Sequence, residues 1–180
     1  MTTLVHRLRR AIPLLVAALA LVFFYRLAFT DSILARGDTF AYFYPYWHVR
    51  AEAFLAGHLP LWSPDLFMGV PLLANSQIGV FYPPNWPLTP LSPPDAVRVS
   101  ILMHVGWALA GAYLLARRAL RVGPGGALVA AALFALGGHV GAHVEQINQL
   151  QGLSWMPWLF LLLDAALERP LVYTPLRACQ

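Results

Sequence analysis

Apolar residues gather into four runs along the chain, and polar or proline-rich stretches separate the runs. The first three come close to the roughly 20 apolar residues that a helix needs to cross a bilayer, and the fourth is shorter and aromatic. The pattern predicts an all-α polytopic membrane protein, organised as a single membrane module over residues 1–180. The predicted spans cover about residues 12–29, 99–116, 126–142 and 153–167.

The first apolar run is open to a second interpretation. A basic start, an apolar core and the small residues "AALA" at 17–20 also fit a cleavable signal peptide. We favour a membrane span, because the apolar character continues well past the small residues.

Arginines beside the apolar runs predict the orientation. "HRLRR" at 6–10 precedes the first run, and "RRALR" at 117–121 lies between the second and third. Such positive charge stays on the cytoplasmic side. We therefore expect a cytoplasmic N-terminus, a first outer loop at 30–98 and a second outer loop at 143–152, with Cys179 in the cytoplasm.

The composition agrees with a membrane protein. The chain is 59% hydrophobic and 11% charged, whereas a soluble domain is roughly 45–50% apolar and about 25% charged. The net charge of +4 does not indicate a nucleic-acid partner, because most arginines flank apolar runs. The single cysteine excludes an intramolecular disulfide. The chain carries no phosphate-binding loop, no nucleophile elbow and no HExxH zinc motif.

The first outer loop is too long for a plain connector. In its first half, "GDTFAYFYPYWHVRAEAFLAG" predicts a helix from Asp38 to about Gly57, whose tyrosines and tryptophan suit a position in the membrane interface. In its second half, prolines and glycines recur every few residues, which predicts an irregular but ordered loop. Its amide side chains are candidates for hydrogen bonds to a polar ligand: Asn75, Gln77 and Asn85.

Asp38 is the acid that the pattern singles out. It follows a glycine just beyond the first span and opens the ring-rich helix. Two interpretations stay open: Asp38 is a functional carboxylate, or it only caps the helix. Asp31 and Asp65 are weaker candidates.

Polar residues also cluster where the third span ends. His139 and His143 are four residues apart and share a helix face, and Glu145 follows closely. That spacing can bind a metal, although polar side chains at a helix end are common. The remaining histidines have simpler interpretations, packing inside a span or surface exposure: His104, His48 and His58.

The order of these segments resembles a known family. An apolar helix is followed by "GDTFAYFYPYW", then "GHLPLWSPDLFMGVPLLANSQIGVFYPPNW", and later "GGHVGAHVEQINQLQGLSWMPW". The chain resembles the N-terminal part of the YfhO-like family of bacterial multi-spanning membrane proteins, grouped with the GT-C glycosyltransferases. The resemblance runs through nearly all of residues 10–165.

The resemblance implies a function. Members of the GT-C group transfer a sugar from a polyprenyl-phosphate donor to an envelope glycopolymer or lipid outside the bacterial cytoplasmic membrane. They carry an acid in the first outer loop, as a general base or as part of a divalent-metal site, and Asp38 occupies that position here. The bilayer, the lipid-linked donor and the acceptor are the expected partners, and no metal ligand is assigned. The expected substrate-binding residues are Arg36, Tyr42, Tyr44, Arg50, Asn75, Gln77 and His143.

The chain departs from this family in length, because members have many further spans. We therefore expect it to be an incomplete member that inserts into a membrane but does not transfer sugar alone. The first alternative is a non-catalytic accessory protein whose outer loop binds a partner or a lipid. A small transporter is disfavoured, because the middle of each span carries no acid and only one histidine, His104.

Overall fold

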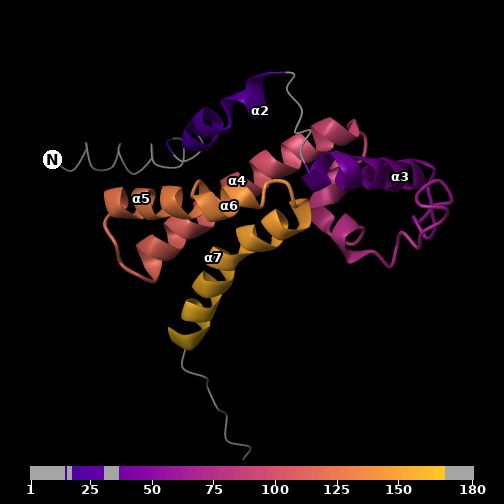
Figure 1. Cartoon of the computed structure of the whole chain (residues 1–180). Coiled ribbons are helices and arrows are strands. Elements are labelled where there is room, and N and C mark those ends of the chain that lie inside the picture. Colours follow the sequence, from indigo (N-terminus) through magenta and orange to yellow (C-terminus); the bar gives the residue numbers. More distant parts are fainter. Residues whose placement is uncertain (1–14, 16–17, 31–36, 169–180) are drawn as a thin grey trace, which may run out of the picture.

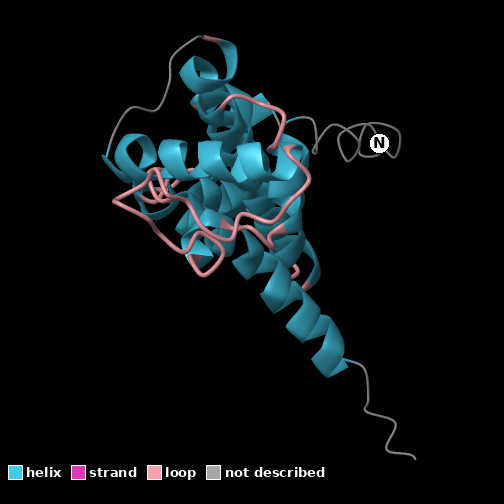
Figure 2. Cartoon of the chain, turned by 90° about the vertical axis from the view of Figure 1, so that its right-hand side faces the viewer, coloured by secondary structure: helices cyan, strands magenta, loops and turns pink. Residues whose placement is uncertain are grey.

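The computed structural model describes residue 15, residues 18–30 and residues 37–168 (Figure 1). The first part of the predicted span 12–29, Arg36 and Cys179 lie outside these residues. The described chain consists of helices and loops (Figure 2), and its only β-type pairing is an isolated bridge between Ser63 and Val70. The predicted all-helical class is confirmed for the described residues.

Three helical segments in the described part of the chain are long and apolar enough to cross a membrane: Pro93–Arg118, Pro124–Ala142 and Ile147–Leu167. They correspond to α4 (Pro93–Arg118), to α5 (Pro124–Ala135) with α6 (Gly138–Ala142), and to α7 (Ile147–Glu168). Each contains a run that the hydrophobic pattern marks as a span. The described residues of the first predicted span include α2 (Tyr25–Phe29), which packs against α4.

Two spans begin earlier than the apolar pattern predicts. Helix α4 starts at Pro93 instead of residue 99, because Ser92 caps it by accepting a hydrogen bond from the Asp95 backbone N–H at 3.4 Å. Arg98 then lies inside the helix, 3.4 Å from the Asp95 carboxylate. Helix α7 starts at Ile147 instead of residue 153, so the second outer loop shrinks to the residues between α6 and α7.

The third apolar run is broken near its end. Helix α5 stops at Ala135, and Gly137 starts the separate short helix α6. At Gly137 an added Cβ would come 2.2 Å from the carbonyl oxygen of Leu133, so the break requires a glycine. The pair Gly137–Gly138 is the sequence signal for this break.

Residues 37–92 gather at one end of the helices, at the right in Figure 1, and we call them the first loop. This segment contains a π-helical turn (Thr39–Phe43), α3 (Tyr44–Leu55) and two short 3₁₀ helices (Ser76–Ile78 and Pro83–Leu88). As predicted, the helix ends just before Gly57, whose φ is +78°.

The tyrosines and tryptophan of the first-loop helix were predicted to lie in the membrane interface, but most of its aromatic rings are buried inside the protein. Phe43, Tyr44, Tyr46 and Trp47 are between 2% and 9% exposed and belong to the core of the chain. The helix packs against α4 and the 3₁₀ turn at 76–78, so its rings are covered by protein. Phe40, at 60% exposure, is an exception.

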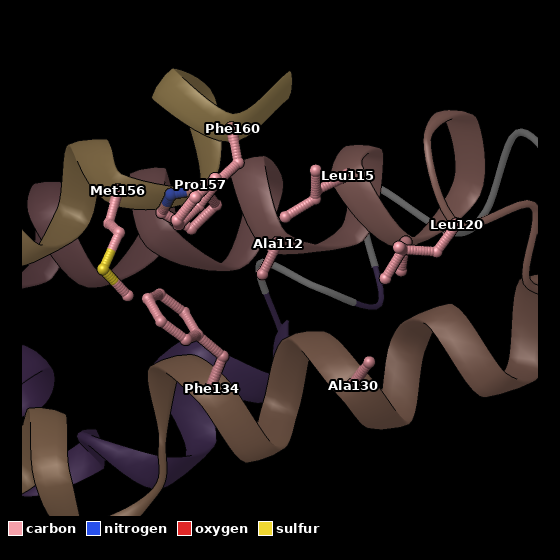
Figure 3. Close-up of a pocket in the computed structure, with 9 residues that line it drawn as sticks. Ala112, Leu115, Leu120, Ala130, Phe134, Met156, Pro157 and Phe160 are labelled. Atoms are coloured by element: carbon pink, nitrogen blue, oxygen red, sulfur yellow. The ribbon is translucent and has the colours of Figure 1, made fainter. Parts of the chain in front are cut away.

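Helix α4 is the centre of the membrane layer, because both α5 and α7 pack on it. In Figure 1, α7 diverges from α5 as it leaves the first loop. An apolar groove of about 250 Å³ lies over α4, between α5 and α7 (Figure 3). Its lining consists of Ala112, Leu115, Ala116, Leu120, Ala130, Phe134, Met156, Pro157 and Phe160.

Candidate functional site

Asp38 is exposed at the start of the first-loop helix. Gly37 is already helical, and Asp38 itself has helical dihedral angles (φ −65°, ψ −24°) without a side-chain capping bond. A capping residue has extended dihedral angles and accepts a hydrogen bond from the first turn. The structure therefore contradicts the capping interpretation, because the Asp38 carboxyl accepts no capping hydrogen bond from the backbone N–H groups of the helix.

The residues on either side of Asp38 contact the link between α6 and α7. The buried Thr39 hydroxyl donates a hydrogen bond of 3.0 Å to the backbone carbonyl of Glu145. At Gly37, with φ at +51°, an added Cβ would lie 2.5 Å from the Glu145 carboxylate. The structure thus brings the two predicted outer loops together at Asp38.

The histidine pair lies close to this junction. The rings of His139 and His143 are 4.6 Å apart between centroids, and His143 Nδ1 bonds the carbonyl of His139 at 2.7 Å. Because a carbonyl only accepts, that bond fixes Nδ1 of His143 as the donor. Among the described residues, no group of three His, Cys, Asp or Glu side chains could hold a metal.

Three of the predicted substrate-binding residues contribute to the packing of the first loop. The Asn75 amide donates to the Tyr42 hydroxyl, and its oxygen accepts the backbone N–H of Gln77 at 3.1 Å. Tyr42 also stacks on Tyr46 at 4.3 Å. Tyr44 is buried in the core, whereas the Gln77 side chain is exposed.

Arg50 is a buried cation, only 1% exposed. Its guanidinium lies 4.3 Å from the ring centroid of Trp47 and donates a hydrogen bond of 2.9 Å to the carbonyl of Ile78. Burial lowers the pKa of Arg50 to about 10, because a charged group loses its hydration there. In this position Arg50 ties α3 to the loop that follows.

A buried polar network, which sequence reasoning did not predict, anchors the proline-rich half of the first loop. The amide of Gln151 in α7 donates to Asn85 Oδ1 at 2.8 Å and to the Ser100 hydroxyl at 3.3 Å. Asn85 is 1% and Ser100 0% exposed. Gln151 therefore joins the loop, α4 and α7 at a single point.

His104 extends this network toward the aromatic side chains. Its Nδ1 lies 2.7 Å from the carbonyl of Ser100, so we assign the proton to Nδ1 and an acceptor role to Nε2. Tyr82 then donates to Nε2 at 2.8 Å and accepts from the Trp155 indole at 2.7 Å. Burial raises the pKa of the Tyr82 hydroxyl, and the Trp155 bond opposes part of that rise. His104 is therefore a hydrogen-bonded packing residue inside α4, as the sequence predicts.

Comparisons of this chain with protein-family models, with curated proteins and with solved structures find no match. The resemblance to the YfhO-like family therefore stays a prediction.

The junction of the two loops offers one exposed carboxyl, Asp38, with the Glu145 carboxylate next to Gly37. The α6–α7 link also carries an imidazole, His143, two residues before Glu145. A carboxylate can accept a proton, and an imidazole can donate one. The groove in Figure 3 offers no such chemistry, because hydrocarbon lines it. The junction is therefore the candidate functional site.

Proposed function

We propose that this chain is the N-terminal part of a membrane glycosyltransferase. It would move a sugar from a polyprenyl-phosphate donor to an envelope glycopolymer or lipid on the outer face of a bacterial cytoplasmic membrane. The sequence resemblance motivates the proposal, and three candidate membrane-spanning helices are compatible with it.

The observation that carries the proposal is the exposed Asp38 carboxyl, which has no capping role and lies where the two loops meet. In the proposed step the acceptor oxygen attacks the anomeric carbon of the sugar, and its proton passes to Asp38. The bond from that carbon to the phosphate oxygen breaks, and its electron pair leaves with the polyprenyl phosphate. A carboxylate in this role typically accelerates transfer by about 10²–10⁴-fold.

The test is Asp38→Asn in cells that carry the complete gene, with transfer of labelled sugar from the polyprenyl donor into the envelope as the readout. We expect transfer to fall by about 100-fold or more, with an unchanged amount of membrane-inserted protein. Asp65→Asn is the matched control, because Asp65 is another exposed acid of the first loop. Transfer at the wild-type rate in Asp38→Asn contradicts a catalytic role for this carboxyl.

The alternative of an accessory protein is favoured by one observation in the first loop. Phe67 and Met68 are 74% and 102% exposed, and both have positive φ, +48° and +67°. Non-glycine residues held in that region cost on the order of 1–3 kcal/mol each and cluster at functional sites. If the chain only binds a partner, Phe67→Ala with Met68→Ala lowers envelope assembly, and Asp38→Asn does not.

A further inference from the structure

A second hollow, which we call the aromatic pocket, lies where the first loop meets α4 and α7. It encloses about 200 Å³. Tyr82 and Pro84 of the loop form one wall, and Trp155 of α7 forms another. Met103, His104 and Trp107 of α4 complete the lining.

The pocket lies beside the apolar parts of two candidate spans. Met103 is four residues beyond Val99, where the apolar part of α4 begins, which corresponds to about 6 Å along a helix. Met103 and Trp155 are 39% and 36% exposed, so the pocket is open at the surface of the helix layer. In a membrane, the medium at that surface is lipid.

Water is a poor occupant of this pocket. A bound water needs two to four polar partners, but Tyr82, His104 and Trp155 direct their hydrogen bonds at one another and at Ser100. One lone pair of the Tyr82 oxygen remains. An empty pocket is also unfavourable, because its walls lose their dispersion contacts.

An anionic head group fits no better, because no arginine lines the pocket and the Trp155 indole N–H already donates to Tyr82. The walls present rings and a thioether, which make favourable contacts with hydrocarbon. The apolar lining and the position on two candidate spans favour a hydrocarbon chain.

We propose that the aromatic pocket binds one acyl chain of a membrane phospholipid. The chain packs against Trp107, Trp155 and Met103, and it supports the first loop through Tyr82 and Pro84. This inference rests on the candidate spans and the pocket lining, and it does not depend on sugar transfer.

Lipid tails are as apolar as the pocket, so the preference comes from packing and is modest. The protein is placed in nanodiscs of phosphatidylethanolamine and phosphatidylglycerol that contain a phospholipid with a diazirine in mid-chain. After photolysis, adducts are located by mass spectrometry. We expect about fivefold more adduct on the pocket residues than on Leu133 and Leu159, which are 72% and 62% exposed on other parts of the helices.

Met103→Trp fills the pocket, and we expect it to lower pocket labelling by about fivefold. Val99→Trp is the matched control, because Val99 lies one turn earlier on α4, is 38% exposed and does not line the pocket. Met103→Phe is a second, smaller filling variant if the tryptophan prevents folding.

Equal labelling of the pocket and of the two leucines would mean that lipid only solvates the surface, which would overturn the proposal. Undiminished labelling of the pocket in both Met103 variants would also overturn the proposal. If polyprenyl phosphate at the same mole fraction abolishes the label, the pocket belongs to a different lipid, and the phospholipid assignment is wrong.

Discussion

Replacing Gln151 by leucine tests whether the buried network holds the first loop on the membrane helices. Gln151 is 6% exposed and donates to two acceptors that are themselves buried, Asn85 Oδ1 and the Ser100 hydroxyl. Leucine has a similar volume and cannot donate, so Gln151→Leu leaves Asn85 Oδ1 without this donor and removes one of two contacts of the Ser100 hydroxyl, which are both 3.3 Å long. The remaining contacts of these groups are long, 3.5 Å from Asn85 Nδ2 to the carbonyl of Gly79 and 3.3 Å from Ser100 Oγ to His104 Nδ1.

The expected loss of stability depends on how many buried polar atoms lose their hydrogen-bond partner. A buried polar atom without a partner costs about 1–3 kcal/mol, and Asn85 Oδ1 is the atom that loses its donor here. Polar contacts between membrane helices average only about 0.6 kcal/mol in double-mutant cycles, because the unfolded chain in the membrane also finds partners. We therefore expect a decrease of about 1 kcal/mol in the free energy of unfolding, near the lower bound of that range.

The free energy of unfolding can be measured by steric trapping in bicelles, with limited proteolysis of the first loop as a local readout. Gln149→Leu is the control, since Gln149 is exposed on the same helix and should change stability by less than about 0.5 kcal/mol. Adding Asn85→Leu to Gln151→Leu should cost less than the sum of the single changes, because both partners are then apolar. Equal stabilities of Gln151→Leu and Gln149→Leu would refute this account of the network.

Two further predictions concern single residues. Gly111→Ala should destabilise the packing of α4 on α7, because an added Cβ would come 2.5 Å from Trp158 Nε1, whereas Gly106→Ala on the same helix meets nothing within 4 Å and serves as the control. A loss of about 1–3 kcal/mol in thermal or bicelle unfolding is expected for the first variant only, and equal behaviour of the two would contradict the close approach. For Arg50, whose pKa burial lowers to about 10, the folded state releases its proton before the unfolded state does, so stability rises with pH above 10. Relative to Arg50→Met, the wild type should gain about 1 kcal/mol between pH 9 and pH 11, and a constant difference would contradict the lowered pKa of Arg50.

The helical class and the apolar runs could be predicted because each depends on local composition. The starts of the helices could not be read from hydropathy, since they depend on caps: Ser92 and two prolines start α4 before its apolar part begins. The break at Gly137 was visible as a glycine pair, but the steric need for it depends on the carbonyl of Leu133 in the folded helix.

The candidate site was predicted less completely, for a physical reason. Sequence reasoning identified Asp38 and the polar α6–α7 link, and it expected both on the same side of the membrane. The contact between Thr39 and Glu145 joins residues that are 106 positions apart, and no local signal specifies such a pairing. The same holds for Arg50, whose burial against Trp47 depends on a carbonyl from a separate loop.

The divergence of α5 and α7 has a mechanical consequence. The polar and aromatic contacts of α7 with α4 and the first loop gather in its first half, at Gln151, Trp155 and Trp158. Pro157 lacks the backbone N–H that would bond one turn back, and Phe160, just beyond it on α7, lines the groove in Figure 3. A change in the tilt of α7 after Trp158 would therefore alter the width of the groove, and it would leave intact the hydrogen bonds of Gln151 and Trp155 with the first loop.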